Sequence, residues 1–291
     1  MVGQPTSVSQ LIRYGESFLT SHGVPNALRN AEWLLAHVLD FRSADLYLDG
    51  SYSPAQTQID AFQRLLDRRG AREPLQYILG TTEFMSLQFY SPPGVFIPRP
   101  DTEALVERIE RHLQDNGDGG RRLIADLCCG SGVIGISVVK RVANTTARAV
   151  DLSQAAVDLT ARNAALNGVR DRVECIHGDA IEYVGQVGDR FDVVACNPPY
   201  IPTDDIQNLA PEIREHEPKL GLDGGGTGLD FYCAIAGVLR RSLKSGGLLA
   251  FEIGSDQAER VADILADRGF VEIEVHPDYA GLDRVVIARS V

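Results

Sequence analysis

The sequence predicts a mostly parallel α/β sheet with an antiparallel hairpin at one edge, preceded by a small all-α bundle. From residue 121 onward, five apolar and partly β-branched runs occur, and helical stretches separate the first four of them. Two further runs near the C-terminus are typical of a closing hairpin. Residues 1–72 instead carry apolar positions at helical spacing, without a strand-like run.

The predicted strands are short segments rich in Val, Ile, Leu and Ala. The five runs are Leu123–Leu127, Ala147–Leu152, Val173–His177, Phe191–Cys196 and Leu248–Ile253. The hairpin is expected at Val271–Val275 and Arg284–Arg289. Strands buried on both faces read as continuous apolar runs, so this pattern favours a parallel sheet covered by helices on both sides.

The chain divides into three expected segments. Residues 1–72 are expected to form the helical bundle, with Ser7 as the cap of its first helix. In residues 73–103, short apolar pieces alternate with Gly and Pro, which indicates a hairpin followed by a stiff connector. Residues 104–291 are expected to form the sheet domain that carries the chemistry.

Composition excludes several classes of protein. With 40 acidic and 28 basic residues, the formal net charge of −12 argues against a protein that binds duplex nucleic acid. The sequence holds no run of about 18 apolar residues, so no membrane segment is expected. The first thirty residues lack the features of signal and transit peptides. A cytoplasmic location is therefore expected.

The cysteines are not expected to form a disulfide framework or a metal site. There are five of them, an odd and sparse set, and none forms a Cys-x-x-Cys pair. No His lies at ligand spacing from the adjacent pair Cys128–Cys129. We expect reduced thiols and no bound metal.

The turn after the first predicted strand is a candidate ligand site, because α/β sheets bind ligands beyond the carboxyl ends of their strands. It reads Asp126-Leu-Cys-Cys-Gly-Ser-Gly132, and a helix follows. Glycines allow close backbone approach, and a helix N-terminus offers free N–H groups. The turn lacks the Lys of a phosphate-binding loop and does not match Gly-x-Gly-x-x-Gly. A tight turn without a ligand remains the alternative.

Acidic residues follow the second and third predicted strands. Asp151 lies nineteen residues after Gly132, where a nucleoside-binding fold places a carboxylate on the ribose hydroxyls. A helix cap is the alternative, although Ser153 could also cap. Asp179, followed by Ala180, could accept a hydrogen bond from an exocyclic amine or could simply cap a helix. Together with the Gly-containing turn, Asp151 favours a nucleoside cofactor.

The fourth predicted strand ends in the most specific pattern of the chain, Asn197-Pro198-Pro199-Tyr200. Two prolines fix φ and donate no hydrogen bond, so the carbonyl groups of the turn are held rigidly. Asn197 adds a side-chain acceptor and donor, and Tyr200 adds a flat aromatic face. This set suits a planar –NH2 group that donates two hydrogen bonds.

These strand-end residues together resemble the S-adenosylmethionine-dependent methyltransferases with a Rossmann-like, seven-stranded sheet that modify planar nitrogens. Further stretches are similar to the peptide chain release factor N5-glutamine methyltransferase family. They are Glu73–Gly80, Phe96–Glu103, the segment from Glu217 to Tyr232, and Asp278–Arg284. The similarity runs from about residue 73 to the end, and the helical segment matches the small helical domain of that family. One departure is Cys128, where the family usually has Gly.

The resemblance implies a cofactor, S-adenosylmethionine, with S-adenosylhomocysteine as its product. The turn would hold the methionine part, Asp151 the ribose and Asp179 the adenine amine. The implied cofactor-binding residues are Asp126, Cys128, Cys129, Gly130, Ser131, Gly132, Asp151, Asp179, Ala180 and Asn197. The substrate carboxamide would bind at Asn197, Pro198, Pro199 and Tyr200, with Asn197, Pro198 and Tyr200 as the catalytic residues. No histidine is given a catalytic role.

The resemblance implies that the partner is a class 1 peptide chain release factor, methylated on the glutamine of its Gly-Gly-Gln loop. The helical segment would recognise this partner, and we expect a monomer that contacts neither nucleic acid nor membrane. The alternatives are methylation of a ribosomal-protein glutamine, methylation of DNA adenine, and a non-catalytic module that binds S-adenosylmethionine. The charge of −12 and the lack of a domain of the size needed for base flipping disfavour the DNA enzyme.

Overall fold

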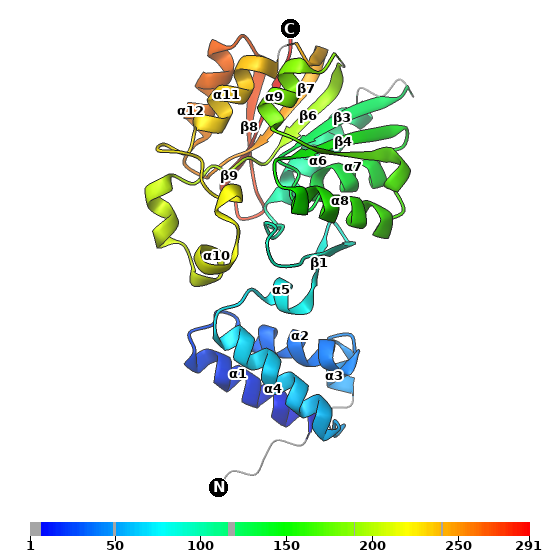
Figure 1. Cartoon of the computed structure of the whole chain (residues 1–291), viewed down its shortest axis with the longest axis vertical. Coiled ribbons are helices and arrows are strands. Elements are labelled where there is room, and N and C mark those ends of the chain that lie inside the picture. Colours follow the sequence, from blue (N-terminus) through cyan, green and yellow to red (C-terminus); the bar gives the residue numbers. More distant parts are fainter. Residues whose placement is uncertain (1–6, 49–50, 116–119, 189, 240) are drawn as a thin grey trace. The chain divides into compact units, whose positions relative to one another are not determined.

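The computed structural model of the chain describes residues 7–48, 51–115, 120–188, 190–239 and 241–291 (Figure 1). The chain forms two units. The first, which we call the helical unit, comprises Met1–Gly80 together with Ala210–His216. The second, the sheet unit, comprises Thr81–Leu209 and Glu217–Val291. The chain therefore enters the helical unit twice, once at its beginning and once through a segment of seven residues.

The helical unit is built from amphipathic helices around an apolar core. Its helices are α1 (Val8–Ser21), α2 (Ala27–Leu39), α3 (Asp45–Leu48), α4 (Gln56–Gly70), α5 (Leu75–Leu79) and α10 (Pro211–His216). Ser7 caps α1 as expected, because its side chain accepts from the backbone of Gln10 and the Gln10 side chain accepts in return. Gly15 lets α1 approach its neighbours: a Cβ there would lie 2.9 Å from both Ala31 Cβ and Phe62 Cζ.

The sheet unit contains the predicted parallel sheet with its antiparallel edge. The seven strands lie in the order β5-β4-β3-β6-β7-β9-β8. They are β3 (Arg122–Leu127), β4 (Thr145–Asp151), β5 (Val173–His177), β6 (Phe191–Cys196), β7 (Leu243–Glu252), β8 (Val271–Pro277) and β9 (Asp283–Arg289). Pairs among β3 to β7 are parallel, and β9 pairs antiparallel with both β7 and β8. The predicted fold class is confirmed, including the hairpin at the edge.

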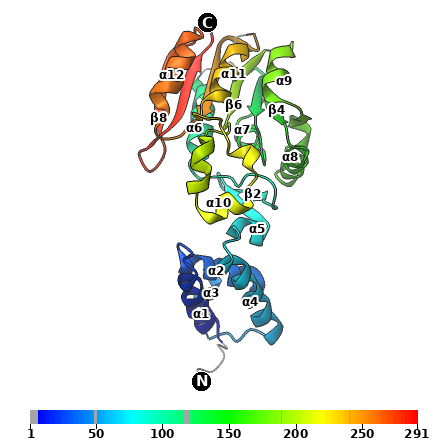
Figure 2. The same cartoon turned by 60° about the vertical axis from the view of Figure 1, so that its left-hand side comes forward.

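Helices cover both faces of this sheet (Figures 1 and 2). They are α6 (Thr102–Asp115), α7 (Val133–Arg141) and α8 (Gln154–Leu166) on one face, and α9 (Ala180–Gln186), α11 (Asp230–Leu239) and α12 (Ala258–Asp267) on the other. Successive strand residues alternate between the two cores: Val193 packs in the first and Val194 in the second. This alternation explains why the strands are apolar throughout.

Smaller elements complete the sheet unit. A separate two-stranded sheet pairs β1 (Thr81–Phe84) with β2 (Leu87–Tyr90). The short 3-10 helices within the described residues are η1 (Arg170–Arg172), η2 (Thr203–Asn208) and η3 (Lys219–Gly221). None of the helices in the described ranges is long and apolar enough to cross a membrane.

The predicted start of the last parallel strand is wrong. The expected start is Leu248, whereas β7 begins at Leu243. Gly246 and Gly247 interrupt the apolar run, yet the backbone pairing starts before them, at Leu243 opposite Phe191. Glycine inside a strand marks an irregularity in the pairing and need not end the strand.

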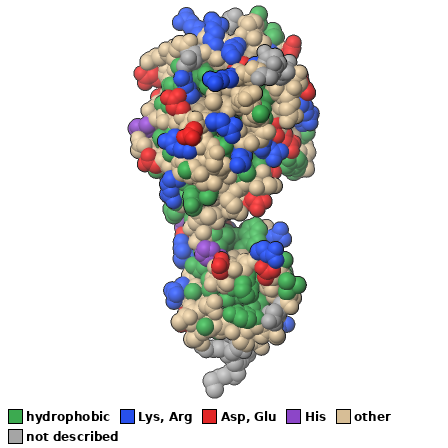
Figure 3. Space-filling view, turned by 90° about the vertical axis from the view of Figure 1, so that its right-hand side faces the viewer, with side chains coloured by type: hydrophobic (Ala, Val, Ile, Leu, Met, Phe, Trp, Pro, Cys, Tyr) green, Lys and Arg blue, Asp and Glu red, His purple; other side chains and the backbone are tan. Residues whose placement is uncertain are grey.

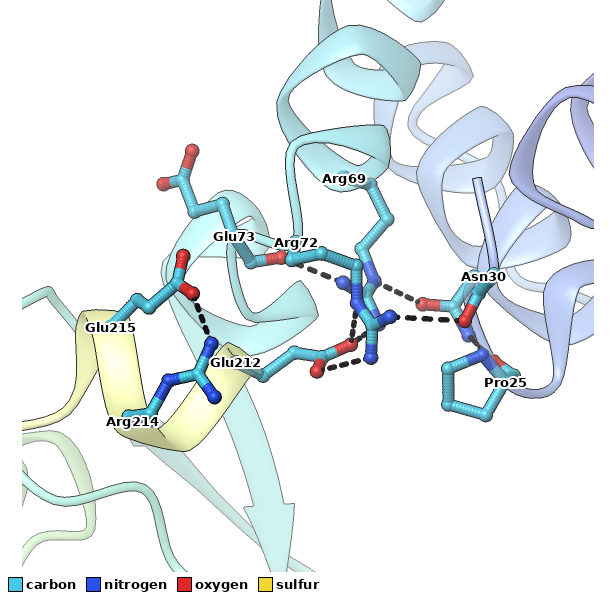
Figure 4. Close-up of polar contacts among 9 residues, drawn as sticks. Pro25, Asn30, Arg69, Arg72, Glu73, Glu212, Arg214 and Glu215 are labelled. Carbon is cyan, nitrogen blue, oxygen red and sulfur yellow. Dashed lines mark hydrogen bonds and ion pairs between the residues drawn. The ribbon is translucent and has the colours of Figure 1, made fainter. Parts of the chain in front are cut away.

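An ion-pair cluster joins α10 to the end of α4 within the helical unit (Figure 4). The Glu212 carboxylate accepts from Arg69 at 2.7 Å and from Arg72 at 2.8 and 2.6 Å. Arg69, whose side chain is 5% exposed, also donates to Asn30 Oδ1 at 2.8 Å. Burial alone raises the pKa of Glu212, but the hydrogen bonds from Arg72 and Arg69 outweigh burial and lower this pKa to about 2.

We expect Glu212→Gln to destabilise the helical unit at neutral pH. A carboxyl whose folded-state pKa is lowered stabilises the fold above its ordinary pKa, and this stabilisation is lost as pH falls toward about 2. The pKa difference corresponds to a loss on the order of 3 kcal/mol, and Arg69 is left buried without its partner. Urea unfolding of the full chain, followed by the fluorescence of Trp33 in α2, measures it.

The matched control is Glu215→Gln. Glu215 also lies in α10, but its side chain is 52% exposed and it pairs with the exposed Arg214. An exposed pair contributes about 0–1 kcal/mol, so this variant should unfold like the parent. If the two variants had the same free energy of unfolding between pH 5 and 8, the proposed contribution of Glu212 to stability would be contradicted.

Candidate active site

The carboxyl ends of four parallel strands border one cavity of about 340 Å³ in the sheet unit. The segments that follow β3, β4, β5 and β6 all contribute to its wall. The predicted site residues that line it are Cys128, Cys129, Gly130, Ser131, Asp151, Asp179, Ala180, Asn197, Pro198, Pro199 and Tyr200. The structure thus brings together nearly all the predicted residues at one edge of the sheet.

Two predicted residues, Asp126 and Gly132, lie outside the cavity wall. Asp126 is fully buried in β3, and its Oδ2 accepts from the backbone N–H of Gly135 in α7 at 2.8 Å. Burial raises the pKa of Asp126 to about 7, although the Gly135 N–H opposes this. Among the described residues, no hydrogen-bond donor reaches its Oδ1 atom. Asp126 therefore supports the turn from within the core.

The turn between β3 and α7 has a left-handed backbone at three positions. The φ angles are 56° at Cys128, 55° at Gly130 and 79° at Gly132. At Gly132 a Cβ would also lie 2.6 Å from Thr160 Cγ2, so both conformation and space require glycine. A Cβ at Gly130 would meet nothing within 4 Å. The turn is therefore open above Gly130 and packed beneath Gly132.

Asp151 connects this turn to the end of β4. Its Oδ2 accepts from the Gly130 N–H and its Oδ1 accepts from the Ser153 N–H, both at 2.9 Å. Ser153, and not Asp151, caps α8 through its hydroxyl. Burial raises the pKa of Asp151, while the two N–H groups act in the opposite direction. A carboxylate oxygen can accept two hydrogen bonds, and each oxygen of Asp151 accepts one here. Both can therefore still accept from a ligand in the cavity.

Asp179 has a structural role and also lies on the wall. It caps α9, because its Oδ1 accepts from the backbone N–H groups of Ile181 and Glu182 at 2.8 and 3.0 Å. The capping alternative is therefore present in the structure alongside the position expected for ligand binding. His177 lies outside the wall, exposed, with Nε2 3.0 Å from the carbonyl oxygen of Leu152.

The turn Asn197-Pro-Pro-Tyr200 forms another part of the cavity wall. Behind it, Gln257 Nε2 donates to the Tyr200 carbonyl oxygen at 3.0 Å. Ile201 pairs with the segment around Asp223. A Cβ at Gly224 would lie only 2.7 Å from Tyr200 Cα. Backbone packing thus holds the turn, and its two prolines restrict φ in addition.

Several residues around this turn were not predicted individually. Asn197 Nδ2 donates to Thr102 Oγ1 at 3.4 Å, and the Tyr200 hydroxyl donates to Glu252 Oε1 at 3.5 Å. Thr102 and Gln257 do not stand out in the sequence. Glu252 could have been noticed, because it is a charged residue that ends a buried strand. The described residues contain no group of three or more His, Cys, Asp or Glu that could hold a metal ion.

Comparison with known proteins agrees with this geometry. Residues 10–80 match the family model described as PrmC N-terminal domain, and residues 86–226 match that described as Methyltransferase small domain. Among solved structures, a 16S rRNA N2 methyltransferase from T. thermophilus, in complex with AdoMet and guanosine, superposes with a TM-score of 0.52 at 17% identity. The alignment covers 72% of this chain and 50% of that one, and it shows the shared fold.

Two curated relatives cover nearly the whole chain. The release factor glutamine methyltransferase of Geobacter sulfurreducens is 38% identical over 97% of this chain and 96% of its own length. That of Clostridium acetobutylicum is 37% identical over 90% of each. At this identity and coverage the chain belongs to the release factor glutamine methyltransferase family.

Proposed function

We propose that this protein transfers a methyl group from S-adenosylmethionine to the side-chain amide nitrogen of a glutamine in a class 1 release factor. The observation that carries the proposal is the position of the Asn197–Tyr200 turn. It lies on the wall of the same cavity as Asp151 and the Gly130 turn. A site for a planar amide and a site for a nucleoside would therefore share one cavity.

The residues of the cavity fit S-adenosylmethionine. Asp151 and Asp179 offer carboxylate oxygens that can accept from ribose hydroxyls and from the adenine amine. The open backbone at Gly130 can approach the methionine part closely. The volume of about 340 Å³ lies within the range of small-molecule sites. When bound, S-adenosylmethionine supplies a methyl group on a positively charged sulfur.

The Asn197–Tyr200 turn would hold the substrate amide. The –NH2 group of glutamine can donate one hydrogen bond to Asn197 Oδ1 and one to the carbonyl oxygen of Pro198. Tyr200 can pack against the plane of the amide. An amide nitrogen is a weak nucleophile because its lone pair is delocalised into the carbonyl group. The acceptors fix its direction and stabilise the positive charge that develops on it, and such positioning lowers barriers by several kcal/mol.

The helical unit would recognise the release factor. Figure 3 shows hydrophobic side chains gathered on one face of this unit. Large apolar side chains that are exposed in it are Tyr14, Leu28, Trp33, Tyr47, Leu48 and Tyr52. Exposed apolar side chains that gather in a patch often mark a protein-binding surface, whereas singly scattered ones are common on any protein. The names of the curated relatives support a release factor as the partner.

The direct test is mass spectrometry of a class 1 release factor after incubation with this protein and S-adenosylmethionine. We expect a gain of one methyl group on the glutamine of the Gly-Gly-Gln loop. The control substrate carries Ala in place of that glutamine and should gain nothing. Methylation of the control, or none of the parent while cofactor binding is intact, would contradict the proposed substrate.

Two substitutions should separate amide binding from cofactor binding. We expect Asn197→Ala to lower turnover by about 10²–10³-fold while the cofactor dissociation constant changes little, because one acceptor of the developing charge is lost. Asp151→Ala should instead weaken cofactor binding by roughly 10–100-fold, since hydrogen bonds to a charged group are lost. Steady-state kinetics and calorimetric titration measure the two effects.

Exposed neighbours provide matched controls for these variants. Asn208 ends η2 outside the cavity, and Asp158 lies on the exposed side of α8. Asn208→Ala and Asp158→Ala should leave both constants as in the parent. Turnover retained in Asn197→Ala would contradict the proposed amide site, whatever the result for Asp151→Ala.

The strained turn yields a prediction about stability. Cys128 has a φ of 56°, and a left-handed backbone costs a residue other than glycine on the order of 1 kcal/mol. Glycine relieves this strain but adds freedom to the unfolded chain. We expect Cys128→Gly to be more stable than Cys128→Ala by ~0.5–1 kcal/mol. Equilibrium urea unfolding measures it, and an alanine variant at least as stable as the glycine variant would contradict the assigned strain.

A further inference from the structure

Glu252 is a buried carboxyl group beside the proposed amide site, and the mechanism above gives it no role. It is the last residue of β7, and its neighbour Phe251 pairs with Cys196, which precedes Asn197. Only 1% of its surface is exposed. Burying a carboxylate is unfavourable unless polar groups compensate for the lost water. Its position therefore calls for an explanation.

The partners of Glu252 are the polar groups of the amide site. The Tyr200 hydroxyl donates to Oε1 at 3.5 Å. The Thr102 hydroxyl and the Asn197 amide also lie close enough to lower the pKa of Glu252. Asn197 Nδ2 donates to Thr102 Oγ1, so the amide nitrogen of Asn197 is turned toward Thr102 and Glu252. Among the described residues, Glu252 Oε2 has no hydrogen-bond partner of normal geometry.

The orientation of the Asn197 amide decides whether it can bind the substrate. With the nitrogen turned inward, Oδ1 is left to accept from the –NH2 group of glutamine. If the Asn197 amide rotated by about 180°, its –NH2 group would point at the –NH2 group of the substrate, and two donors would meet. The rotation would also place Oδ1 against the Glu252 carboxylate, which has no hydrogen to donate when it is ionised. An ionised Glu252 therefore disfavours the unproductive orientation.

We propose that Glu252 is a positioning residue whose ionised carboxylate keeps the Asn197 amide nitrogen turned inward and its oxygen directed at the substrate amide. This inference rests on the proposed function and deepens it. Glu252 itself does not touch the reacting atoms. It acts through Asn197 and Tyr200.

Protonation of Glu252 would reverse this preference, because a neutral carboxyl can donate to Asn197 Oδ1. Burial raises the pKa of Glu252 to about 7, and the groups around it shift it in both directions. Thr102 and Asn197 lower this pKa, as does the cation of Arg284 on β9, while the charge of Asp101 raises it.

The remaining polar groups near Glu252 help to fix its surroundings. Tyr232 of α11 donates to the Glu252 backbone oxygen at 2.7 Å. Arg284 donates to the Ile253 carbonyl oxygen at 3.1 Å and to Asp278 Oδ2 at 3.3 Å. The stretch Asp278–Arg284, which resembles the family, thus holds the Arg284 cation near the Glu252 carboxylate.

The test compares the full-length parent with Glu252→Gln at saturating cofactor and varied release factor, from pH 5.5 to 8.5. Glutamine has the same shape but can donate to Asn197 Oδ1. We expect kcat to fall about 10–100-fold at pH 8, since small misplacements in an active site cost up to about 10². KM and the cofactor dissociation constant should each change less than about threefold. The exposed Glu259→Gln on α12 is the matched control.

The pH profile is the readout that a purely structural role would not move. In the parent, kcat should fall below a midpoint near the pKa of Glu252, about 7, approaching tenfold per pH unit. In Glu252→Gln this midpoint should be absent. Thr102→Val removes a hydroxyl that lowers this pKa, so the midpoint should move to higher pH. If Glu252→Gln does not fold, the Thr102→Val profile decides, and an unmoved midpoint overturns the proposal.

A measurement without turnover separates this inference from the proposed function. Carbon-13 NMR of carboxyl-labelled glutamate, with Glu252→Gln for assignment, should show one carboxyl titrating near pH 7 in the parent. In Asn197→Ala its midpoint should rise, because the Asn197 amide is lost. If this coupling is present but no release factor is methylated, only the proposed function fails. If methylation occurs and Glu252→Gln matches the parent in kcat and pH profile, the role of Glu252 is overturned.

Discussion

The parallel register of β3 with its two neighbours is the constraint on which the site depends. Leu127 pairs with Val150 on one side and with Cys196 on the other. This register places the turn at 128–132, Asp151 and Asn197 at the same level of the sheet. A slip of one residue in either pairing would turn the following side chains to the opposite face. The two cores on either side of the sheet hold the register, because each strand buries alternate residues in both.

Buried carboxyl groups at the strand ends connect the strands to the segments that follow them. Asp126 accepts from the start of α7, Asp151 accepts from the turn after β3 and from the start of α8, and Glu252 accepts from Tyr200. Burial raises the pKa of each of these acids, so each depends on its hydrogen bonds to remain ionised. The geometry of the cavity and its electrostatics are therefore set by the same side chains.

The fold and most of the cavity wall could be predicted because they follow from local patterns. Asp151 and Asn197 each follow the end of a predicted strand. Because ligands bind at the carboxyl edge of such a sheet, the two residues are expected near each other. The early start of β7 before Gly246 depends on pairing that no local pattern shows. The contact of Glu212 with Arg69 joins residues 143 positions apart, so it could not be predicted either. For Glu252 the sequence shows a charge at the end of a buried strand, but its contacts with Tyr200, Thr102 and Asn197 depend on other elements.

The chemical character of the wall explains why an amide, and not an acid, suits this site. The described residues that line the cavity include no His, Lys or Arg. Burial and Glu252 raise the pKa of Tyr200 above its ordinary value, so its phenol keeps its proton at neutral pH. Burial also raises the pKa of the Cys129 thiol, which leaves it neutral. A substrate therefore meets carbonyl and carboxylate acceptors, without a cation to bind or a strong base.

Such a wall distinguishes glutamine from glutamate by the cost of unpaired acceptors. The –NH2 group of glutamine can satisfy Asn197 Oδ1 and the Pro198 carbonyl oxygen at once. A glutamate carboxylate would bring further acceptors against both, close to the buried charge of Glu252. Leaving buried polar groups unpaired costs about 1–3 kcal/mol each, and more when a charge is involved. Sites built to hydrogen-bond a substrate group reject analogues that lack it far more strongly than apolar pockets do. In the proposed site, selectivity for an amide would thus follow from the same acceptors that would position its nitrogen.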